Sequence, residues 1–495
     1  MDDPLLDRVA GLLRSGVAIA PEGELKRGLD DALRRLHEPL RVAIAGKVKA
    51  GKSTLLNALV GERLAPTDAG ECTRIVTWYR HGETYRAVVH PLEGEPSQAR
   101  FTRDDGALDV DLGGRTPEDV SHLEIWWPSS RLSAMTLLDM PGTASISTHV
   151  SARTEKALLS DDGRPAVADA VIYLLRHLHA TDMHFLESFH DDEEVGHSTP
   201  TTAIGVLSRA DEIGACRRDA LESAARVARR YEAEPSLRRL CRVVVPVAGL
   251  IAQAGATLRE DEFQSIARLS ELPAEELVDL LLSADRFSTL PNSRGVPERE
   301  REQLVARLGI FGVRVSVEYV RAHRAPSASE LASALVALSG IDRLRAVLLT
   351  QFTERARVLK ARSAVLALQA ALRAPEWPAR QRFQEQIELL VTGAHEFVEV
   401  SVIDAARSGV IPLPEEDLME LERLLGAEGM TPAARLGGPR DAPPAELRAI
   451  ALDSLRRWRR VAARPLAPPD VRTAAGAAAR TCEGLITSLD AVPAL

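Results

Sequence analysis

The hydrophobic pattern divides the chain into two regions of different character. Between residue 40 and about residue 250, short apolar runs alternate with stretches of helical periodicity. This alternation is typical of an α/β domain with a largely parallel sheet. The stretch 91–119 is rich in Gly, Pro and acidic residues and predicts a hairpin or loop insertion. The expected strands are 41–45, 74–79, 123–127, 135–138, 170–175, 203–207 and 242–247, and the expected helices between them are 52–60, 181–190 and 217–232.

Helical periodicity dominates outside this region. Residues 5–37 predict two amphipathic helices, and beyond residue 257 the strand signal fades. An apolar stripe that begins at Ile341 and Leu344 steps by three and four residues to Ala370, which predicts one helix about 50 Å long. The stretch 426–444 predicts a long flexible connection. Further helices are expected over 300–323, 379–408, 414–426, 445–463 and 470–489, as a set of long antiparallel helices.

Composition narrows the class of protein. The 495 residues are 45% hydrophobic and 4% aromatic, as in a soluble, helix-rich globular protein. A net charge of −9 argues against nucleic acid as a partner. The cysteines, at 72, 216, 241 and 482, form no C-x-x-C pair, which indicates a reduced, cytoplasmic protein without a zinc site. The N-terminus lacks the features of a signal peptide, and no apolar run is long enough to span a membrane.

The rare lysines mark the first candidate site. Six of the 62 basic residues are lysines, and three of these six lie at 47, 49 and 52. They fall in a G-x-x-x-x-G-K-S motif between an expected strand and an expected helix, the context of a phosphate-binding loop. Lys52 would bridge the β- and γ-phosphates of a nucleotide, and the Ser53 hydroxyl would bind Mg²⁺. The nucleotide-binding residues expected here are Gly46, Lys47, Val48, Lys49, Ala50, Gly51, Lys52, Ser53 and Thr54.

Two later segments fit the order of a GTPase. An apolar run ends in Asp139-Met140-Pro141-Gly142, where Asp139 can hold Mg²⁺ through water and the Gly142 N–H can meet the γ-phosphate. Thr73 is the candidate catalytic and metal-binding threonine between the loop and the next strand, and Thr67 is its alternative.

A third segment is the candidate for recognising the base of the nucleotide. Ser208, Arg209 and Asp211 follow another expected strand and resemble an N/T-K-x-D motif in which Asp211 accepts hydrogen bonds from guanine. A helix-capping turn is the other interpretation, because the Asn and the Lys of that motif are both replaced. A P-loop protein that binds ATP is the rival interpretation of the nucleotide site.

Other features have ordinary interpretations. The histidines at 177, 179, 184 and 190 could suggest a metal cluster, but surface histidines are common beside such a helix. The apolar stretch 308–317 is interpreted as a packed helix or hinge rather than a lipid anchor. The basic run 456–460 is the best candidate for anionic headgroups, although a solvated helix face is the simpler interpretation.

The assembled pattern resembles the bacterial dynamin-like GTPases, and most closely the actinobacterial isoniazid-inducible branch. The resemblance implies an α/β P-loop GTPase head on a long all-α neck and stalk, with GTP/GDP and Mg²⁺ as cofactors. Residues 1–39 would join the neck, 40–256 would form the head, and 257–495 would supply the rest of the neck and the stalk. It also adds Ala248 to the nucleotide-binding residues. The matching stretches are 40–61, 73–77, 138–142, 206–212 and 245–250.

In the family, GTP binding dimerises the heads and hydrolysis swings the stalk to remodel or tether membranes. This chain departs from the family at Lys49, which stands where eukaryotic dynamins carry a cation-binding serine. We hypothesise that the Lys49 ammonium replaces the monovalent cation or acts as a finger in cis; the alternative is a lysine that contacts a partner head or solvent.

A lipid-inserting segment is also missing from the pattern. Direct membrane contact therefore stays open, and a related dynamin-like partner chain becomes plausible. We expect a cytoplasmic protein, with peripheral contact at the inner face of the cell membrane as an option. The alternative function is a GTP-dependent switch that binds a protein partner without deforming membranes.

Overall fold

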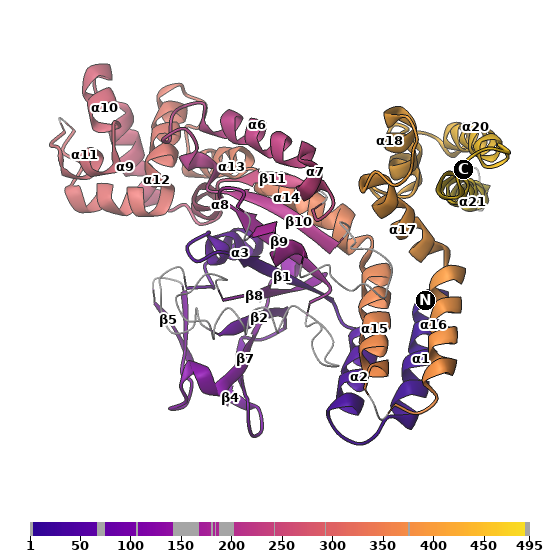
Figure 1. The fold of residues 1–495 in the computed structure, drawn as a ribbon. Helices are drawn as coiled ribbons and strands as arrows, with labels where there is room; N and C mark the ends of the chain where they lie inside the picture. The colour runs from indigo at the N-terminus through magenta and orange to yellow at the C-terminus, as the bar shows by residue number, and fades with distance from the viewer. Residues whose placement is uncertain are drawn as a thin grey trace.

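The computed structural model describes residues 3–490 apart from 67–74, 105–106, 142–167, 180–181, 184, 188–201, 242, 293 and 375–376. Figure 1 shows an α/β head, a bundle of helices beside it that includes the N-terminal helices, and a group of C-terminal helices beyond that bundle. The predicted fold class, a mostly parallel sheet with helices followed by a long helical region, is confirmed.

The described residues of the head form a nine-stranded sheet. The strands from β11 to β8 run parallel, whereas β2 is antiparallel to β8. The predicted strands are confirmed to within a few residues. A separate hairpin of β5 (Phe101–Asp104) and β6 (Ala107–Val110) lies in the stretch predicted to be an insertion. In spatial order the sheet contains β11 (Val244–Val247), β10 (Ala203–Ser208), β9 (Ala170–Leu175), β1 (Leu40–Gly46), β8 (Met135–Asp139), β2 (Val76–His81), β7 (Val120–Trp127), β3 (Arg86–Pro91) and β4 (Ser97–Ala99).

The central strands are buried on both faces, which explains their continuous apolar sequences. One face packs on α3 (Lys52–Val60) and α14 (Ile341–Leu348). The other face packs on α6 (Ala220–Ala233) and on helices that follow the last strand. These later helices are α8 (Gly249–Ala256), α9 (Glu260–Ser270), α10 (Ala274–Leu280), α11 (Ala284–Thr289), α12 (Glu298–Arg321) and α13 (Ala328–Leu338).

The head core therefore continues beyond residue 256. Ile266, Leu304 and Leu335 belong to the same hydrophobic core as Val171 and Leu207 of the sheet. The predicted domain boundary at 256 falls inside this continuous core, and helices expected in the neck and stalk cover the head.

Helix α12 contains a sharp break at Gly309, whose φ of 67° and ψ of 167° are not helical. Leu308, Phe311 and Val313 on either side of the break are buried in the head core. The stretch 308–317 is thus a packed, kinked helix as predicted, and its apolar side chains are not exposed to lipid.

A bundle beside the head, called here the first bundle, combines the two N-terminal helices with two helices that follow the head in the sequence. It consists of α1 (Pro4–Ile19), α2 (Glu24–Arg35), α15 (Ala356–Leu372) and α16 (Arg380–Gly393), which share one apolar core. Helix α1 begins after Asp3, whose carboxylate accepts hydrogen bonds from the Leu5 and Leu6 N–H groups at 3.0 and 3.2 Å. In Figure 1 these helices run side by side at the edge of the head.

The predicted helix over 341–370 is interrupted. A π-helical turn, Leu349–Thr353, follows α14, and α15 begins only at Ala356. Arg355 between them is buried and donates a hydrogen bond to the Leu425 carbonyl at 3.3 Å. The apolar stripe was correct, but the prediction of one uninterrupted helix was wrong, because the chain turns here to bring Arg355 onto the C-terminal helices.

The C-terminal helices form what we call the terminal bundle. The predicted flexible connection over 426–444 was wrong, because it contains the short helix α19, whose Arg435 is buried against Glu399 and the Leu424 carbonyl. The basic run is also paired: Arg457 contacts Asp417 and Glu420. The terminal bundle consists of α17 (His395–Arg407), α18 (Glu415–Leu424), α19 (Pro432–Leu436), α20 (Pro444–Ala462) and α21 (Pro469–Asp490).

Candidate functional site

The phosphate-binding loop lies between β1 and α3, at the carboxyl end of the central strand. Its first residue, Gly46, has a φ of 147°, and a Cβ there would lie 2.9 Å from the Leu174 carbonyl oxygen. A side chain is therefore excluded by the neighbouring strand β9. Helix α3 begins at Lys52, so its free N–H groups and positive dipole end face the loop.

Lys52 is held inside this loop. Its ammonium donates hydrogen bonds to the carbonyl oxygens of Gly46 at 3.2 Å and Lys47 at 3.3 Å. Burial lowers the pKa of Lys52, while the nearby Asp139 carboxylate acts in the opposite direction. The ammonium is thus fixed beneath the loop amides, where a phosphate group would be bound.

Ser53 and Asp139 meet as the sequence predicted for a metal site. The Ser53 hydroxyl donates a hydrogen bond to Asp139 Oδ2 at 3.0 Å. Burial raises the pKa of Asp139 to about 6, against the opposing effects of Lys52 and of the Ser53 hydrogen bond. The other oxygen, Oδ1, is buried without a hydrogen-bond partner among the described residues. An unsatisfied carboxylate oxygen beside a hydroxyl is a donor set that suits Mg²⁺.

The predicted base-recognition segment approaches the same loop. Arg209 follows β10 in a left-handed conformation, with φ at 52°, and donates to the Lys49 carbonyl oxygen at 3.0 Å. It also pairs with Glu212 at 2.9 Å. Segments 160 residues apart in the sequence are therefore joined at one site.

Asp211 is almost completely enclosed, with 4% of its surface exposed, and burial raises its pKa to about 6. The 3₁₀ turn Ala210–Glu212 begins without a side-chain cap, which removes the main support for the helix-capping interpretation. The break in α12 lies alongside, because a Cβ on Gly309 would be 3.6 Å from Asp211 Oδ2. Arg209 offsets this effect of burial only in part, so the Asp211 carboxylate is suited to hydrogen-bond donors of a ligand.

The remaining predicted residues differ in their roles. The Ser208 hydroxyl donates to the Leu175 carbonyl at 3.2 Å and so links strand β10 to strand β9. Ala248 is buried, and its N–H donates to the Ser339 carbonyl at 2.9 Å. Thr54 packs against Gly249, and Val48 is exposed. The predictions for Thr67, Thr73 and Gly142 concern residues outside the described part of the chain, as do His184 and His190 of the histidine group.

Two lysines of the loop have contrasting environments. Lys47 forms an ion pair with Asp182 at 3.0 Å, and Asp182 also accepts hydrogen bonds from the Tyr173 hydroxyl at 2.9 Å and the His179 N–H at 3.0 Å. This anchor was missed, because no motif marks Asp182 in the sequence. The Lys49 side chain is exposed, and no hydrogen bond or ion pair joins its ammonium to the described residues.

Comparisons with known proteins identify relatives in the dynamin family. A model of the dynamin family matches residues 42–179. The chain is 40% identical over 501 residues to the isoniazid-induced protein IniC of Mycobacterium tuberculosis, covering 98% of this chain and 99% of that protein. It is 38% identical over 82 residues to a bacterial dynamin-like protein of Nostoc punctiforme, covering 16% of this chain and 12% of that protein.

Solved structures of an oligomerised bacterial dynamin pair are also similar. One is 13% identical with a TM-score of 0.29 and covers 99% of this chain and 75% of that chain. Another is 12% identical with a TM-score of 0.32 and covers 99% and 77%. Scores this low carry no structural argument, so the family assignment depends on the sequence matches.

Proposed function

The chain belongs to the dynamin family of GTPases, and from that premise we propose that it binds GTP with Mg²⁺ and hydrolyses it to GDP and phosphate. The observation that carries this proposal is the cluster of Lys52, Ser53 and Asp139 at the start of α3. It unites a phosphate-binding cation with the donors of a magnesium site. Arg209, which contacts the loop through the Lys49 carbonyl, and Asp211, two residues later, would form the site for the base.

The roles of the residues follow from their positions. The N–H groups at the start of α3 and the Lys52 ammonium bind the phosphates and offset their charge. Ser53 would be a ligand of Mg²⁺, and Asp139 would hold the ion through water. The ion, when bound, neutralises charge on the β- and γ-phosphate oxygens. Asp211 accepts hydrogen bonds from the N1 and N2 donors of guanine, which adenine does not present in this arrangement.

Lys49 is the candidate for stabilising the developing charge between the β- and γ-phosphates. Its carbonyl is fixed by Arg209, its φ is 60°, and its ammonium extends from the loop into solvent. An ammonium in that place can serve in place of a monovalent cation. Contact with the loop of a partner head is the other assignment that these observations allow.

We further propose that the heads dimerise on GTP and that the first bundle, as neck, moves the terminal bundle, as stalk, in membrane remodelling or tethering. Arg35 at the end of α2 forms a buried ion pair with Asp169 at 2.8 Å. Asp169 precedes β9 and ends the segment that begins after Asp139, and it also accepts from the Arg41 N–H at 2.9 Å. Through this pair α2 of the neck would move together with strands β1 and β9 of the head.

Direct lipid contact is not required by this proposal. Within the described ranges, none of the helices combines the length and apolar character needed to cross a bilayer. A related dynamin-like chain would then provide the membrane attachment, and contact with the inner face of the cell membrane would be peripheral.

The test of the proposed nucleotide is a change of base specificity. Asp211→Asn replaces a pure acceptor with a group that can donate, so it should lose affinity for GTP and gain affinity for XTP, whose ring carries an oxygen at position 2. Binding of labelled GTP, XTP and ATP to the full chain measures this. Asp285→Asn, at an exposed position on α11, is the matched control. Retained GTP preference in Asp211→Asn, or ATP preference in the wild type, would contradict the proposal.

A further inference from the structure

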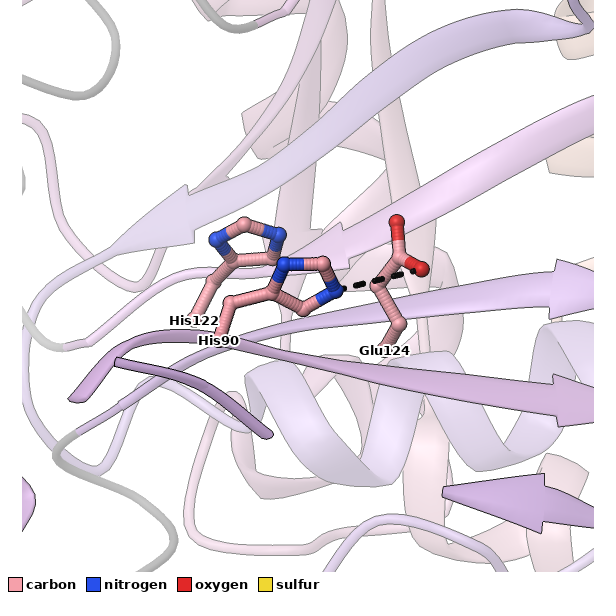
Figure 2. Close-up of side chains that lie close together, drawn as sticks. All are labelled: His90, His122 and Glu124. Atoms are coloured by element: carbon pink, nitrogen blue, oxygen red, sulfur yellow. Dashed lines mark ion pairs between the residues drawn. The ribbon is translucent and has the colours of Figure 1, made fainter. Parts of the chain in front are cut away.

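We propose that His90, His122 and Glu124 form a binding site for a divalent transition-metal ion of the zinc type, separate from the nucleotide site. Their candidate ligand atoms all lie within 4.8 Å of one another, and no other group of this kind occurs in the ranges that the structure describes. Figure 2 shows the two imidazole rings stacked, with the Glu124 carboxylate facing one nitrogen of His90.

The register of the sheet brings these residues together. On the antiparallel strands β3 and β7, His90 lies opposite His122, and Val88 lies opposite Glu124. Side chains alternate between the faces of a strand, so His122 and Glu124 project from the same face of β7. The cluster is therefore fixed by strand pairing and not by loops, which favours a defined geometry.

The separations are close to those of a metal site. His90 Nε2 and a Glu124 oxygen are 3.4 Å apart, and the two rings are 4.2 Å apart between centroids at an interplanar angle of 12°. Zinc at about 2.0–2.1 Å from each ligand holds neighbouring ligand atoms about 3.3 Å apart. The His90–Glu124 pair already meets this spacing, whereas the stacked rings would have to rotate about their Cβ–Cγ bonds for both imidazoles to face one ion.

Neighbouring groups orient His122 and Glu124 and leave one ligand atom of each available. Ser121 Oγ lies 3.3 Å from Nδ1 of His122, so Nε2 is the nitrogen left for an ion. Arg80 Nε lies 3.4 Å from Oε1 of Glu124, while Oε2 is the oxygen that faces His90. Trp78 stacks on His122 with ring centroids 4.4 Å apart. Such outer contacts commonly hold metal ligands in place.

The local charge is compatible with a bound cation. Arg80 is shared between Glu124 and Glu38, at 3.4 and 3.6 Å, and Arg41 pairs with Glu38 at 2.9 Å. Carboxylates therefore offset the guanidinium groups that border the cluster. Two imidazoles and one carboxylate form a donor set that zinc and neighbouring transition metals prefer over Mg²⁺.

The site is distinct from the proposed magnesium site. Asp139 pairs with Thr77 across β8 and β2, whereas His122 pairs with Val76 and Glu124 with Trp78 across β7 and β2. Because neighbours along a strand point to opposite faces, Asp139 lies on the other face of the sheet. A metal here would crosslink β3 to β7 and adjoin, through Arg80, the Glu38 segment that links α2 to the head.

Cobalt titration of the nucleotide-free full chain tests the proposal, because Co²⁺ in a site of low coordination number absorbs visible light. We expect one ion per chain with the ligand-field bands of bound imidazole, and displacement by Zn²⁺. His90→Asn and Glu124→Gln should each weaken binding by more than about tenfold. The matched control is the double variant His177→Asn/His179→Asn, which removes an exposed histidine pair 6.2 Å apart and should leave binding unchanged.

Wild-type fluorescence gives an independent measurement should a ligand variant fail to fold. Trp78 contacts His122, so bound Co²⁺ should quench its emission, and Trp78→Phe should remove most of the quenching. No bound ion, binding that survives both His90→Asn and Glu124→Gln, or binding lost in the control variant would overturn the proposal. In each of these cases the cluster is only a contact between His90 and Glu124 within the sheet.

Discussion

Asp211→Asn should stabilise the nucleotide-free protein while it removes the acceptor of the proposed guanine site. The wild-type carboxylate is 4% exposed, and burial raises its pKa from 3.8 to about 6. Keeping it ionised therefore costs folding free energy that an isosteric, neutral amide does not incur. A group retained at such a cost is expected where ligand recognition needs it.

The size of this folding cost follows from the pKa shift of Asp211. Each pKa unit is worth about 1.4 kcal/mol, so the ionised carboxylate costs up to about 3 kcal/mol. Because the pKa of Asp211 is higher in the folded than in the unfolded state, its ionisation destabilises the fold. This cost is absent below the unfolded pKa of 3.8 and is complete above the folded pKa of about 6. Asp211→Asn should therefore gain its full stability advantage near neutral and alkaline pH and little of it near pH 4.

Urea unfolding of the nucleotide-free wild type and variant at about pH 8 and about pH 4.5 measures this difference. The exposed control Asp285→Asn should show no such pH-dependent gain. An equal stability difference at both pH values, or a variant less stable than the wild type at the higher pH, would refute the reasoning from burial.

Three further outcomes are expected. Gly46→Ala should lose about 1–3 kcal/mol in urea unfolding, because its Cβ would meet a β9 carbonyl at 2.9 Å; a loss no larger than that of Gly484→Ala, where no such contact exists, would contradict this. Lys49→Ser should make GTP turnover dependent on potassium, and an unchanged rate and ion profile would exclude the proposed role. Arg435→Leu should destabilise the chain by up to about 3–5 kcal/mol in thermal or urea unfolding, because the buried Glu399 loses its guanidinium and keeps Thr481 and His395. Adding Glu399→Leu should then restore part of the loss, and a double variant no more stable than the single one would contradict the assignment.

The sheet was predictable because its signal is local. Strands β1, β9 and β10 are buried along their whole length, so their sequences are continuous apolar runs between polar turns. The phosphate-binding loop was predictable for a similar reason, since glycines, Lys52 and Ser53 act within one short segment. The contact of Ser53 with Asp139 followed from the order of motifs along the chain.

What could not be predicted depends on contacts between distant residues. Lys47 pairs with Asp182 over 135 positions, and neither periodicity nor motif marks that partner. Arg435 has the sequence appearance of a surface residue in a loop, yet it is buried because Glu399 neutralises it. The His90–His122 cluster arises from strand register, which the sequence does not specify.

The helix interruption before α15 could not be predicted from the sequence either. The apolar stripe continues through Phe352 into α15, and the π-helical turn preserves the buried face while Arg355 leaves helical geometry. Periodicity records which face is buried, but it does not record where the backbone changes its hydrogen-bonding pattern.

GTP turnover measured against protein concentration tests the central claim most directly, with ATP as comparator and Lys52→Ala as the blank. The account predicts turnover specific for GTP, absent from the blank, and with a specific activity that rises as heads meet at higher concentration. Preference for ATP, or turnover that survives Lys52→Ala, would contradict a dynamin-type GTPase site. Slow GTP turnover independent of concentration would contradict head dimerisation and favour the alternative of a GTP-dependent switch.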